Sequence, residues 1–231
     1  MNTYAKSTLA ELIGTFTLVF IGAGTGAQAA ASGAGLVGVA LAHGFALMVI
    51  IYAWGSVSGA HVNPAVTLGV LVTGRMNVVQ AVLYWLAQFA GAIAAAFLLK
   101  YLFGGATNLG ITTGSLTFID PLKTVVLEAV LTFFLIIAVF SSGVIGQNGN
   151  IAGLAIGMVL TMDILAGGPL TGASMNPART LGPAIAHGDV TYAWMYFVGP
   201  FAGAVVGALL YNFVFLPERV KAPVEAAERN K

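Results

Sequence analysis

The chain has 231 residues, of which 58% are hydrophobic and only 7% are charged, and its mean hydropathy is +0.94. Soluble domains carry roughly 25% charged residues, so these values exclude an ordinary soluble protein and indicate an integral membrane protein. The formal net charge of +1 provides no basic surface for nucleic acid, and the absence of cysteine excludes disulfides, thiol nucleophiles and thiolate metal sites.

The N-terminal sequence MNTYAKSTLAELIG leads into an apolar run without a small-residue cleavage site, so we expect a first membrane span and not a signal peptide. Segments of about 20 apolar residues predict further spans along the chain. We expect helices, because only helices and closed barrels satisfy their backbone in lipid and no alternating pattern is visible. The six predicted spans are 7–30, 35–54, 78–99, 121–140, 151–165 and 192–215.

Basic residues are distributed unequally over the predicted connections, which predicts the orientation of the chain. If the N-terminus is cytoplasmic, the outer connections carry only Lys100 and Lys123. The inner segments then carry Lys6, Arg75, Arg219, Lys221, Arg229 and Lys231. We therefore expect both termini in the cytoplasm, with 217–231 as a cytoplasmic tail, and we expect the protein in the cell membrane.

Two further apolar segments, 63–73 and 176–187, are too short to cross a hydrocarbon core of about 30 Å at roughly 1.5 Å per residue. Both begin with Asn-Pro. This is a pattern of helix starts, in which Asn caps the helix and Pro occupies the first helical position. The sequence therefore predicts two re-entrant half-helices.

The two halves of the chain repeat each other. AELIGTFTLVF, which contains Glu11, returns as LEAVLTFFLII, which contains Glu128, and QFAGAIAAAFLL returns as PFAGAVVGALL. Each half has three spans, which is an odd number, so the second copy must enter the membrane inverted, and the half-helix N-termini meet at the midplane. We expect one domain over 1–216, with repeats at about 7–100 and 121–216.

The polar segments SGAHVNPAVTLG and TGASMNPARTLG are nearly identical and lie 113 residues apart. Together with six spans in inverted halves and a Glu near the start of each half, they resemble the aquaporin (major intrinsic protein) family over nearly the whole chain. The resemblance implies an all-α membrane protein with six transmembrane helices and two re-entrant half-helices. The pore motifs would be Asn63, Pro64, Ala65, Asn176, Pro177 and Ala178.

The resemblance implies a passive channel for water, and for ammonia or other small uncharged solutes, that excludes ions and protons. Side-chain amides at opposed helix N-termini can donate to single-file molecules while the positive helix ends repel cations. Members of the glycerol branch usually place Asp after the second motif and its Arg, with a basic residue four positions later. Here these positions are Thr180 and Ala184, which favours the water branch.

Arg179 directly follows the second motif, and an ionised side chain in an apolar protein indicates a functional site. The resemblance implies that Arg179 is the filter arginine and that His43, Ile164 and Ala173 complete the filter. This set is similar to that of tonoplast-type members, some of which pass ammonia. We expect His43 to present a polar edge to the pore and Ile164 an apolar wall.

Other polar residues have less specific interpretations. The resemblance implies that Glu11 and Glu128 brace the re-entrant loops, although a proton relay is the alternative for carboxyl groups within spans. His61 is expected to line the cytoplasmic vestibule, with an ordinary hydrogen-bonded loop histidine as the alternative. Asp163 has no assignment.

Competing functions remain open at this point. A glycerol or small-solute facilitator and a low-permeability adhesive or scaffolding membrane protein are the alternatives. An enzyme is not expected, because the sequence has no Cys, no HExxH and no paired Asp, and no cofactor or metal is predicted. The expected partners are water, small neutral solutes and the lipid bilayer, and the resemblance implies a homotetramer with one pore in each subunit.

Overall fold

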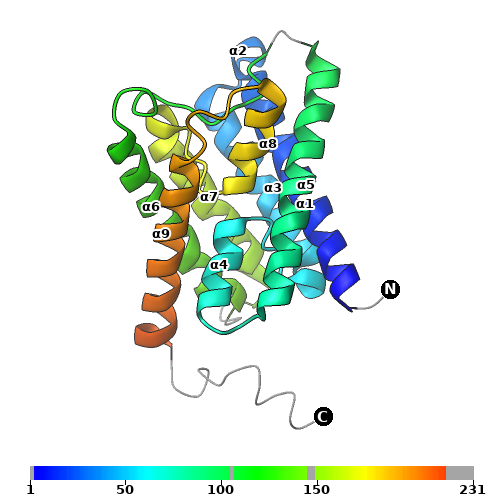
Figure 1. The fold of residues 1–231 in the computed structure, drawn as a ribbon, viewed down its shortest axis with the longest axis vertical. Coiled ribbons are helices and arrows are strands. Elements are labelled where there is room, and N and C mark those ends of the chain that lie inside the picture. The colour runs from blue at the N-terminus through cyan, green and yellow to red at the C-terminus, as the bar shows by residue number, and fades with distance from the viewer. Residues whose placement is uncertain (1–2, 105–106, 145–148, 217–231) are drawn as a thin grey trace.

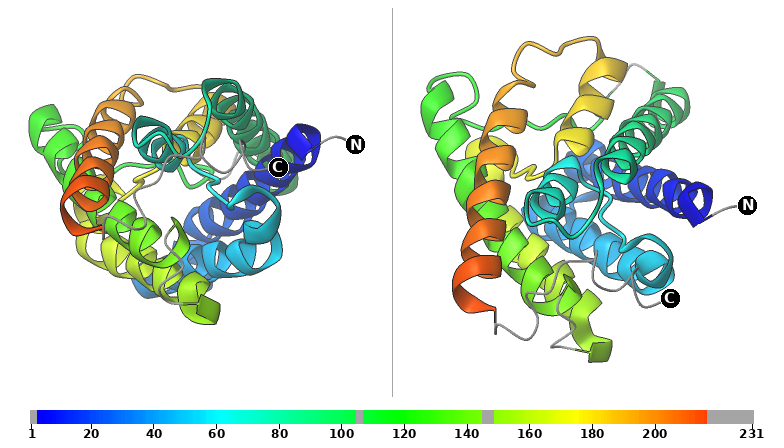
Figure 2. Two further views of the ribbon diagram at one scale, coloured as in Figure 1. Left: turned by 90° about the horizontal axis from the view of Figure 1, so that it is seen from below. Right: turned by 60° about the horizontal axis from the view of Figure 1, so that its bottom comes forward.

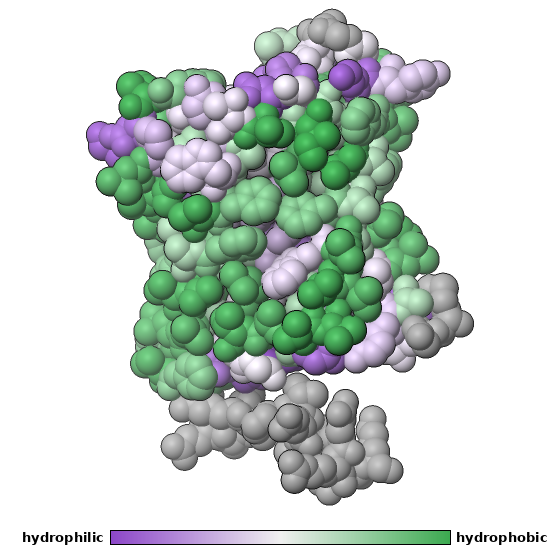
Figure 3. Space-filling model, viewed as in Figure 1, coloured by the Kyte–Doolittle hydropathy of each residue, from purple (hydrophilic) through white to green (hydrophobic). Residues whose placement is uncertain are grey.

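The computed structural model describes residues 3–104, 107–144 and 149–216, so the predicted tail at 217–231 lies outside the described residues. Within the described ranges the chain is helical with no strand, which confirms the all-α fold class. Six helical segments there are long and apolar enough to cross a membrane. Figure 3 shows a broad hydrophobic belt on one face of the molecule, between more polar ends.

Some of the six long segments combine a long α-helix with a second short helix at one end, which is an α-helix, a π-helix or a 3₁₀ turn. The six segments are α1 (Thr3–Ala27) with α2 (Ala29–Ser32), α3 (Gly35–Ser58), α5 (Val78–Phe103), α6 (Pro121–Ala138) with the π-helical η2 (Val139–Val144), the 3₁₀ turn η3 (Gly149–Ile151) with α7 (Ala152–Thr171), and α9 (Met195–Leu210) with the π-helical η4 (Tyr211–Phe215).

The fifth segment is longer than its predicted bounds of 151–165. The two glycines before Pro169 favour an early end of the helix in this segment. In the structure, however, α7 continues through Pro169 to Thr171. A proline in the last turn removes only one backbone donor. The helix ends at Gly172, which has a φ of 86° and donates its N–H to the carbonyl of Gly168. This left-handed glycine is a common helix terminator.

The half-helices α4 (Pro64–Val72) and α8 (Pro177–His187) begin near the centre of the molecule and extend toward opposite ends (Figure 1). Asn63 caps α4 by accepting from the N–H of Ala65, and Asn176 caps α8 by accepting from the N–H of Ala178. Both helices have Pro in their first position. The two short helices predicted from Asn-Pro are therefore confirmed.

Equivalent glycines allow close helix packing in both repeats. A Cβ on Gly91 of α5 would lie 2.3 Å from the carbonyl oxygen of Leu12 in α1. A Cβ on Gly203 of α9 would lie 2.0 Å from the carbonyl oxygen of Ala129 in α6. Small residues of this kind let membrane helices approach closely. The pairs α1–α5 and α6–α9 are therefore the same packing unit used twice.

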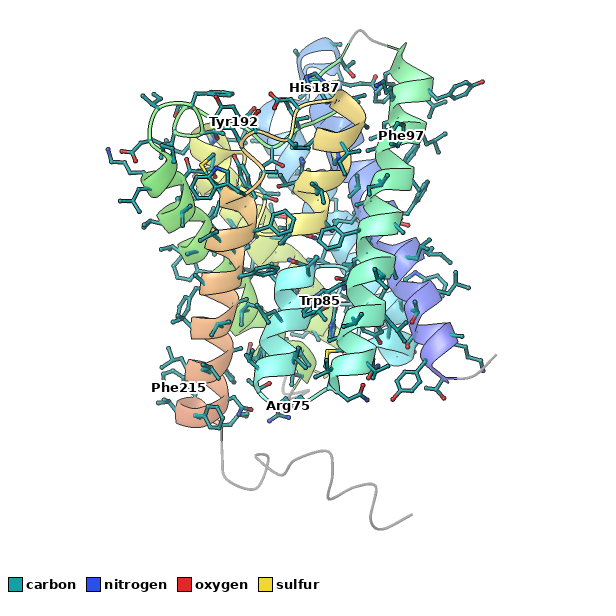
Figure 4. All side chains as sticks on the ribbon, in the orientation of Figure 1. Arg75, Trp85, Phe97, His187, Tyr192 and Phe215 are labelled. Carbon is teal, nitrogen blue, oxygen red and sulfur yellow. The ribbon has the colours of Figure 1, made fainter. Side chains whose placement is uncertain are left out.

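Each half-helix packs chiefly against the last long helix of the other repeat, α4 against α9 and α8 against α5. Figure 2 shows the long helices surrounding α4 in the view from below. Arg75, just after α4, and His187, at the end of α8, lie at opposite ends of the molecule (Figure 4). The second repeat is thus inverted relative to the first, and its half-helix enters from the other side.

Candidate functional site

The loop before α4 is held by one buried carboxylate. Oε1 of Glu11 accepts hydrogen bonds from Oγ of Ser58 at 2.7 Å and from the N–H of His61 at 2.9 Å. Oε2 accepts from the N–H of Val62 at 2.6 Å and from Nε2 of Gln88 at 2.8 Å. The four donors use all the acceptor positions of an ionised carboxylate, so this carboxylate can be buried without an ion pair.

The loop before α8 has the same arrangement. Oε1 of Glu128 accepts from Oγ1 of Thr171 at 2.7 Å and from the N–H of Ser174 at 3.0 Å. Oε2 accepts from the N–H of Met175 at 2.8 Å. Among the described residues Glu128 has no fourth donor equivalent to Gln88, because the repeat places Pro200 at that position. The second carboxylate is therefore satisfied less completely than the first.

Two tyrosines complete this symmetric support. The hydroxyl of Tyr84 donates to the carbonyl of Ser58 at 2.8 Å, and the hydroxyl of Tyr196 donates to the carbonyl of Thr171 at 2.5 Å. Trp85, which lies beside α4 in Figure 4, donates its indole N–H to the carbonyl of Pro64 at 3.1 Å. The start of α4 is thus fixed by α5 as well as by α1.

The backbone next to both half-helices adopts the left-handed conformation at residues other than glycine. Ala60 and Val62 have φ values of 50° and 44°, and Ala173 and Met175 have values of 45° and 54°. A positive φ is a strained conformation for such residues, especially for a β-branched one, and strain of this kind clusters at functional sites. The carboxylate bonds to the Val62 and Met175 amides stabilise the strained loops.

The strained loops direct their carbonyls toward the opposite half-helix. Nδ2 of Asn63 donates to the carbonyl of Met175 at 2.8 Å, and Nδ2 of Asn176 donates to the carbonyl of Val62 at 2.9 Å. Each side-chain amide has two N–H groups, so one remains after this reciprocal bond. Both asparagines line the large cavity described next, which means that each retains a donor for a molecule in that cavity.

Two cavities meet at Arg179. One of about 640 Å³ extends from Ser56 and Asn150 past His61 to the two asparagines and Arg179. Another of about 330 Å³ lies on the other side and is lined by residues that include Ala29, Asn108 and Ile164, together with Arg179. The guanidinium therefore lies at the boundary between spaces that open toward opposite ends of the molecule.

The Arg179 side chain is held on three sides. Its Nη1 donates to the carbonyl of Gly110 at 2.7 Å and to Oγ1 of Thr112 at 2.8 Å, and its Nε donates to Nε2 of His43 at 3.3 Å. Its Nη2 has no hydrogen-bond partner among the described residues, which leaves two N–H donors for a molecule in the cavities.

His43 lines the large cavity, and both of its ring nitrogens have partners within the protein. Its Nδ1 lies 2.8 Å from the carbonyl of Val39, which can only accept, so Nδ1 carries the proton. Its Nε2 faces Nε of Arg179, which can only donate, so Nε2 must be the acceptor. Both ring nitrogens of a neutral imidazole are occupied within the protein. The ring therefore supports Arg179 instead of offering a free nitrogen to the pore.

The other two predicted filter residues lie apart from these polar contacts. Ile164 lines the outer cavity together with Arg179. Ala173 is buried in an apolar cluster with Ile164 and Leu131, and it is not among the residues that line the two cavities. Asp163 is buried as well, and its Oδ2 has no hydrogen-bond partner within the described ranges.

His61 lines the large cavity, and its Nδ1 lies 3.1 Å from Oγ1 of Thr67. Sequence reasoning missed Gln88, whose Nε2 joins Glu11 to Thr67, as well as Gly110 and Thr112. Gln88 could have been noticed as the one polar difference between two matching repeat segments. Gly110 and Thr112 lie on a connection that has no counterpart in the other repeat, so no signal indicated them.

Comparison with known proteins gives a consistent result. The sequence matches the family model described as major intrinsic protein over residues 1–211. Aquaporin TIP2-1 of Arabidopsis thaliana is 42% identical over 234 residues, which cover 96% of this chain and 92% of that protein. Aquaporin TIP1-2 of Zea mays is 42% identical over 236 residues, which cover 97% of this chain and 92% of that protein.

Among solved structures, the X-ray structure of the aquaglyceroporin from Plasmodium falciparum aligns with a TM-score of 0.83 at 26% identity. The alignment covers 93% of this chain and 98% of that one. The family match extends over nearly the whole chain and includes both half-helices with their Asn caps. This chain therefore belongs to the major intrinsic protein family, the family of the aquaporins.

Proposed function

We propose that this protein is a passive channel for water, and for ammonia or other small uncharged solutes, and that it excludes ions and protons. The observation that carries this proposal is the meeting of two cavities at Arg179, close to the reciprocally bonded asparagines. The names of the relatives support it, since proteins about 42% identical over nearly their whole length are aquaporins.

In the proposed mechanism, Asn63 and Asn176 each offer one amide N–H to water molecules that pass in single file. The N-termini of α4 and α8 direct the positive ends of their helix dipoles to the same place. Arg179 adds a fixed positive charge at the boundary of the cavities. The described residues that line the two cavities include no Asp or Glu, so a cation would meet these charges without a carboxylate beside it, whereas water can accept hydrogen bonds from the same donors.

The proposed filter consists of Arg179, His43, Ile164 and Ala173. Ile164 offers no hydrogen bond, and both nitrogens of His43 are already occupied. A molecule that enters this point therefore loses most of its hydrogen bonds to water and regains only a few from the protein, mainly from Nη2 of Arg179. Ammonia is about as small as water and has fewer hydrogen bonds to regain, which favours its passage.

Glu11 and Glu128 are assigned the role of loop braces, and His61 the role of a vestibule residue. The contacts of both carboxylates with the strained loops support the first assignment. A proton relay is disfavoured, because the acceptor positions of Glu11 are all used by non-titrating donors. The position of His61 in the lining of the large cavity supports the second assignment.

We further propose a homotetramer with one pore in each subunit, in the cell membrane and with both termini cytoplasmic. In this orientation Lys6 and Arg75 lie at the cytoplasmic end, and Lys100 and Lys123 lie at the outer end, in agreement with the positive-inside rule. Residues 1–216 form the channel in this proposal, and 217–231 form a cytoplasmic tail. Fractionation of cells that express a tagged chain tests the location.

A glycerol or small-solute facilitator is the second candidate, because one structural relative is an aquaglyceroporin. Thr180 and Ala184 are unlike the residues that the glycerol branch usually carries at these positions. The filter also lacks an aromatic wall for a carbon backbone.

Stopped-flow light scattering on proteoliposomes tests these candidates together, with water, ammonia and glycerol gradients applied in parallel. We expect fast water flux, measurable ammonia flux and little glycerol flux. Glycerol flux as fast as water flux would favour the facilitator. Water flux no faster than in empty liposomes would contradict the channel and favour the scaffolding protein.

A further inference from the structure

A buried hydroxyl outside the family motifs contacts the filter arginine. Oγ1 of Thr112, on the connection between α5 and α6, accepts from Nη1 of Arg179 at 2.8 Å. The same oxygen accepts from the hydroxyl of Thr180 at 3.1 Å. All three side chains are buried. Removing this oxygen would therefore leave one N–H of Nη1 without its acceptor, whereas the hydroxyl of Thr180 could turn toward Oγ of Ser174.

The contact with Thr180 continues into the loop before α8. Oγ1 of Thr180 gives its only proton to Thr112, so Oγ of Ser174 is the donor to Oγ1 of Thr180 at 2.6 Å. The same Ser174 oxygen accepts from the N–H of Asn176 at 3.4 Å. Three hydroxyls therefore connect the guanidinium to the residue that caps the half-helix. Networks of this type are more rigid than their separate bonds, because every member is fixed by its neighbours.

The connection that carries Thr112 is itself fixed to the helix bundle. The N–H of Ser115 donates to the carbonyl of Pro169 at 3.1 Å, and the N–H of Leu116 donates to the carbonyl of Leu170 at 2.8 Å. Gly110 has a φ of 65°, and a Cβ there would lie 2.1 Å from the carbonyl oxygen of Ala23. Contacts with α1 and α7 thus determine where Thr112 lies relative to Arg179.

We propose that Thr112 is a positioning residue that sets the size selectivity of the filter by fixing the Arg179 guanidinium. This inference rests on the proposed channel function. Without Thr112, Nη1 would keep the carbonyl of Gly110 and Nε would keep its longer contact of 3.3 Å with His43, but the second acceptor of Nη1, which limits rotation of the guanidinium, would be lost. If the guanidinium moves, the narrowest part of the proposed filter is wider for part of the time. A wider filter favours the passage of solutes larger than water.

The experiment compares the full-length wild type with Thr112→Val, Thr112→Ser and the neighbouring control Thr113→Val in proteoliposomes. Val has nearly the shape of Thr but lacks the hydroxyl, and Ser keeps it. The hydroxyl of Thr113 makes no hydrogen bond with the described residues, so this control changes the same loop without changing the network. Osmotic water flux and glycerol flux are measured by stopped-flow on the same preparations.

We expect Thr112→Val to raise the ratio of glycerol to water permeability by about threefold or more, as the loss of a buried hydrogen bond implies. Thr112→Ser and Thr113→Val should keep the wild-type ratio. If Thr112→Val yields no monodisperse protein, Thr112→Ala replaces it, since Ala and Ser differ only in the hydroxyl, and the ratio should rise for Ala alone.

An unchanged ratio in the variant without the hydroxyl would overturn the proposal, as would an equal rise in Thr112→Ser or Thr113→Val. These results assume a conducting wild type. A wild type with no more water flux than empty liposomes would overturn the channel function, and this proposal with it. The two failures are therefore distinguished within one set of measurements.

Discussion

Replacing Glu128 by Gln tests whether one carboxylate holds the loop before α8. The substitution keeps the size of the side chain, removes its charge and converts one acceptor oxygen into a donor. In the structure this carboxylate is fully buried and accepts from Thr171, Ser174 and Met175. If the amide nitrogen takes the place of Oε2, its N–H groups face the backbone N–H of Met175, and that contact becomes repulsive.

The size of the effect follows from the three bonds. Hydrogen bonds to a charged group contribute about 1.5–3 kcal/mol and neutral ones about 0.5–1.5 kcal/mol, so the two retained bonds lose roughly 1 kcal/mol each. A buried N–H without an acceptor costs about 1–3 kcal/mol. A neutral side chain avoids the cost of burying a charge, which offsets part of the loss, so we expect a net destabilisation of about 2–4 kcal/mol.

Thermal unfolding of the purified protein in detergent measures this effect. For a chain of about 150–250 residues, each kcal/mol shifts Tm by roughly 2–4 °C, so Glu128→Gln should lower Tm by roughly 4–16 °C. Asp189→Asn is the matched control, because Asp189 is an exposed carboxylate that accepts one backbone bond from Thr191, and its Tm should equal that of the wild type. Equal Tm values for Glu128→Gln and the control would refute the bracing role.

Three further predictions concern permeation. Arg179→Val should admit cations or protons, while the wild type carries no ionic current in planar bilayers at neutral pH; a measurable wild-type current would contradict charge exclusion. The triple variant His43→Phe, Ile164→His, Ala173→Thr should lower ammonia flux more than water flux in parallel stopped-flow traces, and an unchanged ratio would refute this account of the filter. Because the chain has no cysteine, water flux should be insensitive to low concentrations of mercurials, and inhibition that a thiol reductant reverses would be evidence against this.

Much of the fold could be predicted because lipid imposes strong constraints on a chain. The start of α5 at Val78 and the start of α6 at Pro121 agree with the predicted spans, since hydropathy changes sharply at both places. The bounds of α4 and α8 were also close, because Asn-Pro marks a helix start in a local way. The end of α7 was wrong, because hydropathy does not tell whether Pro169 terminates a helix or lies in its last turn.

The bracing role of Glu11 and Glu128, which the family resemblance implied, stays a prediction, and their hydrogen bonds to both loops support it. The polar edge expected of His43 stays a prediction, because His43 lines the large cavity while both of its ring nitrogens have partners within the protein. The residue type indicates that a ring nitrogen is available, but only the neighbours determine whether it is free. Here the carbonyl of Val39 and the Nε of Arg179 occupy both nitrogens.

The role of Thr112 shows what a sequence leaves out. The hydroxyl of Thr112 and the guanidinium of Arg179 are 67 positions apart and share no motif. Their contact depends on how a connecting segment lies over α1 and α7, which is a property of tertiary packing. Residues outside both repeats have no second copy with which to align, so internal comparison could not reveal this contact.

The reciprocal amide bonds also impose an order on biosynthesis. The donor at Asn63 precedes its acceptor, the carbonyl of Met175, by 112 residues. At about 5–20 residues per second, the ribosome delivers that acceptor roughly 6 to 22 s after the donor. During this interval the first repeat has a strained loop and an amide without its final partner. Until α8 is in place, the first repeat therefore lacks both reciprocal bonds of the finished structure, and the entry of α8 supplies the partner of each.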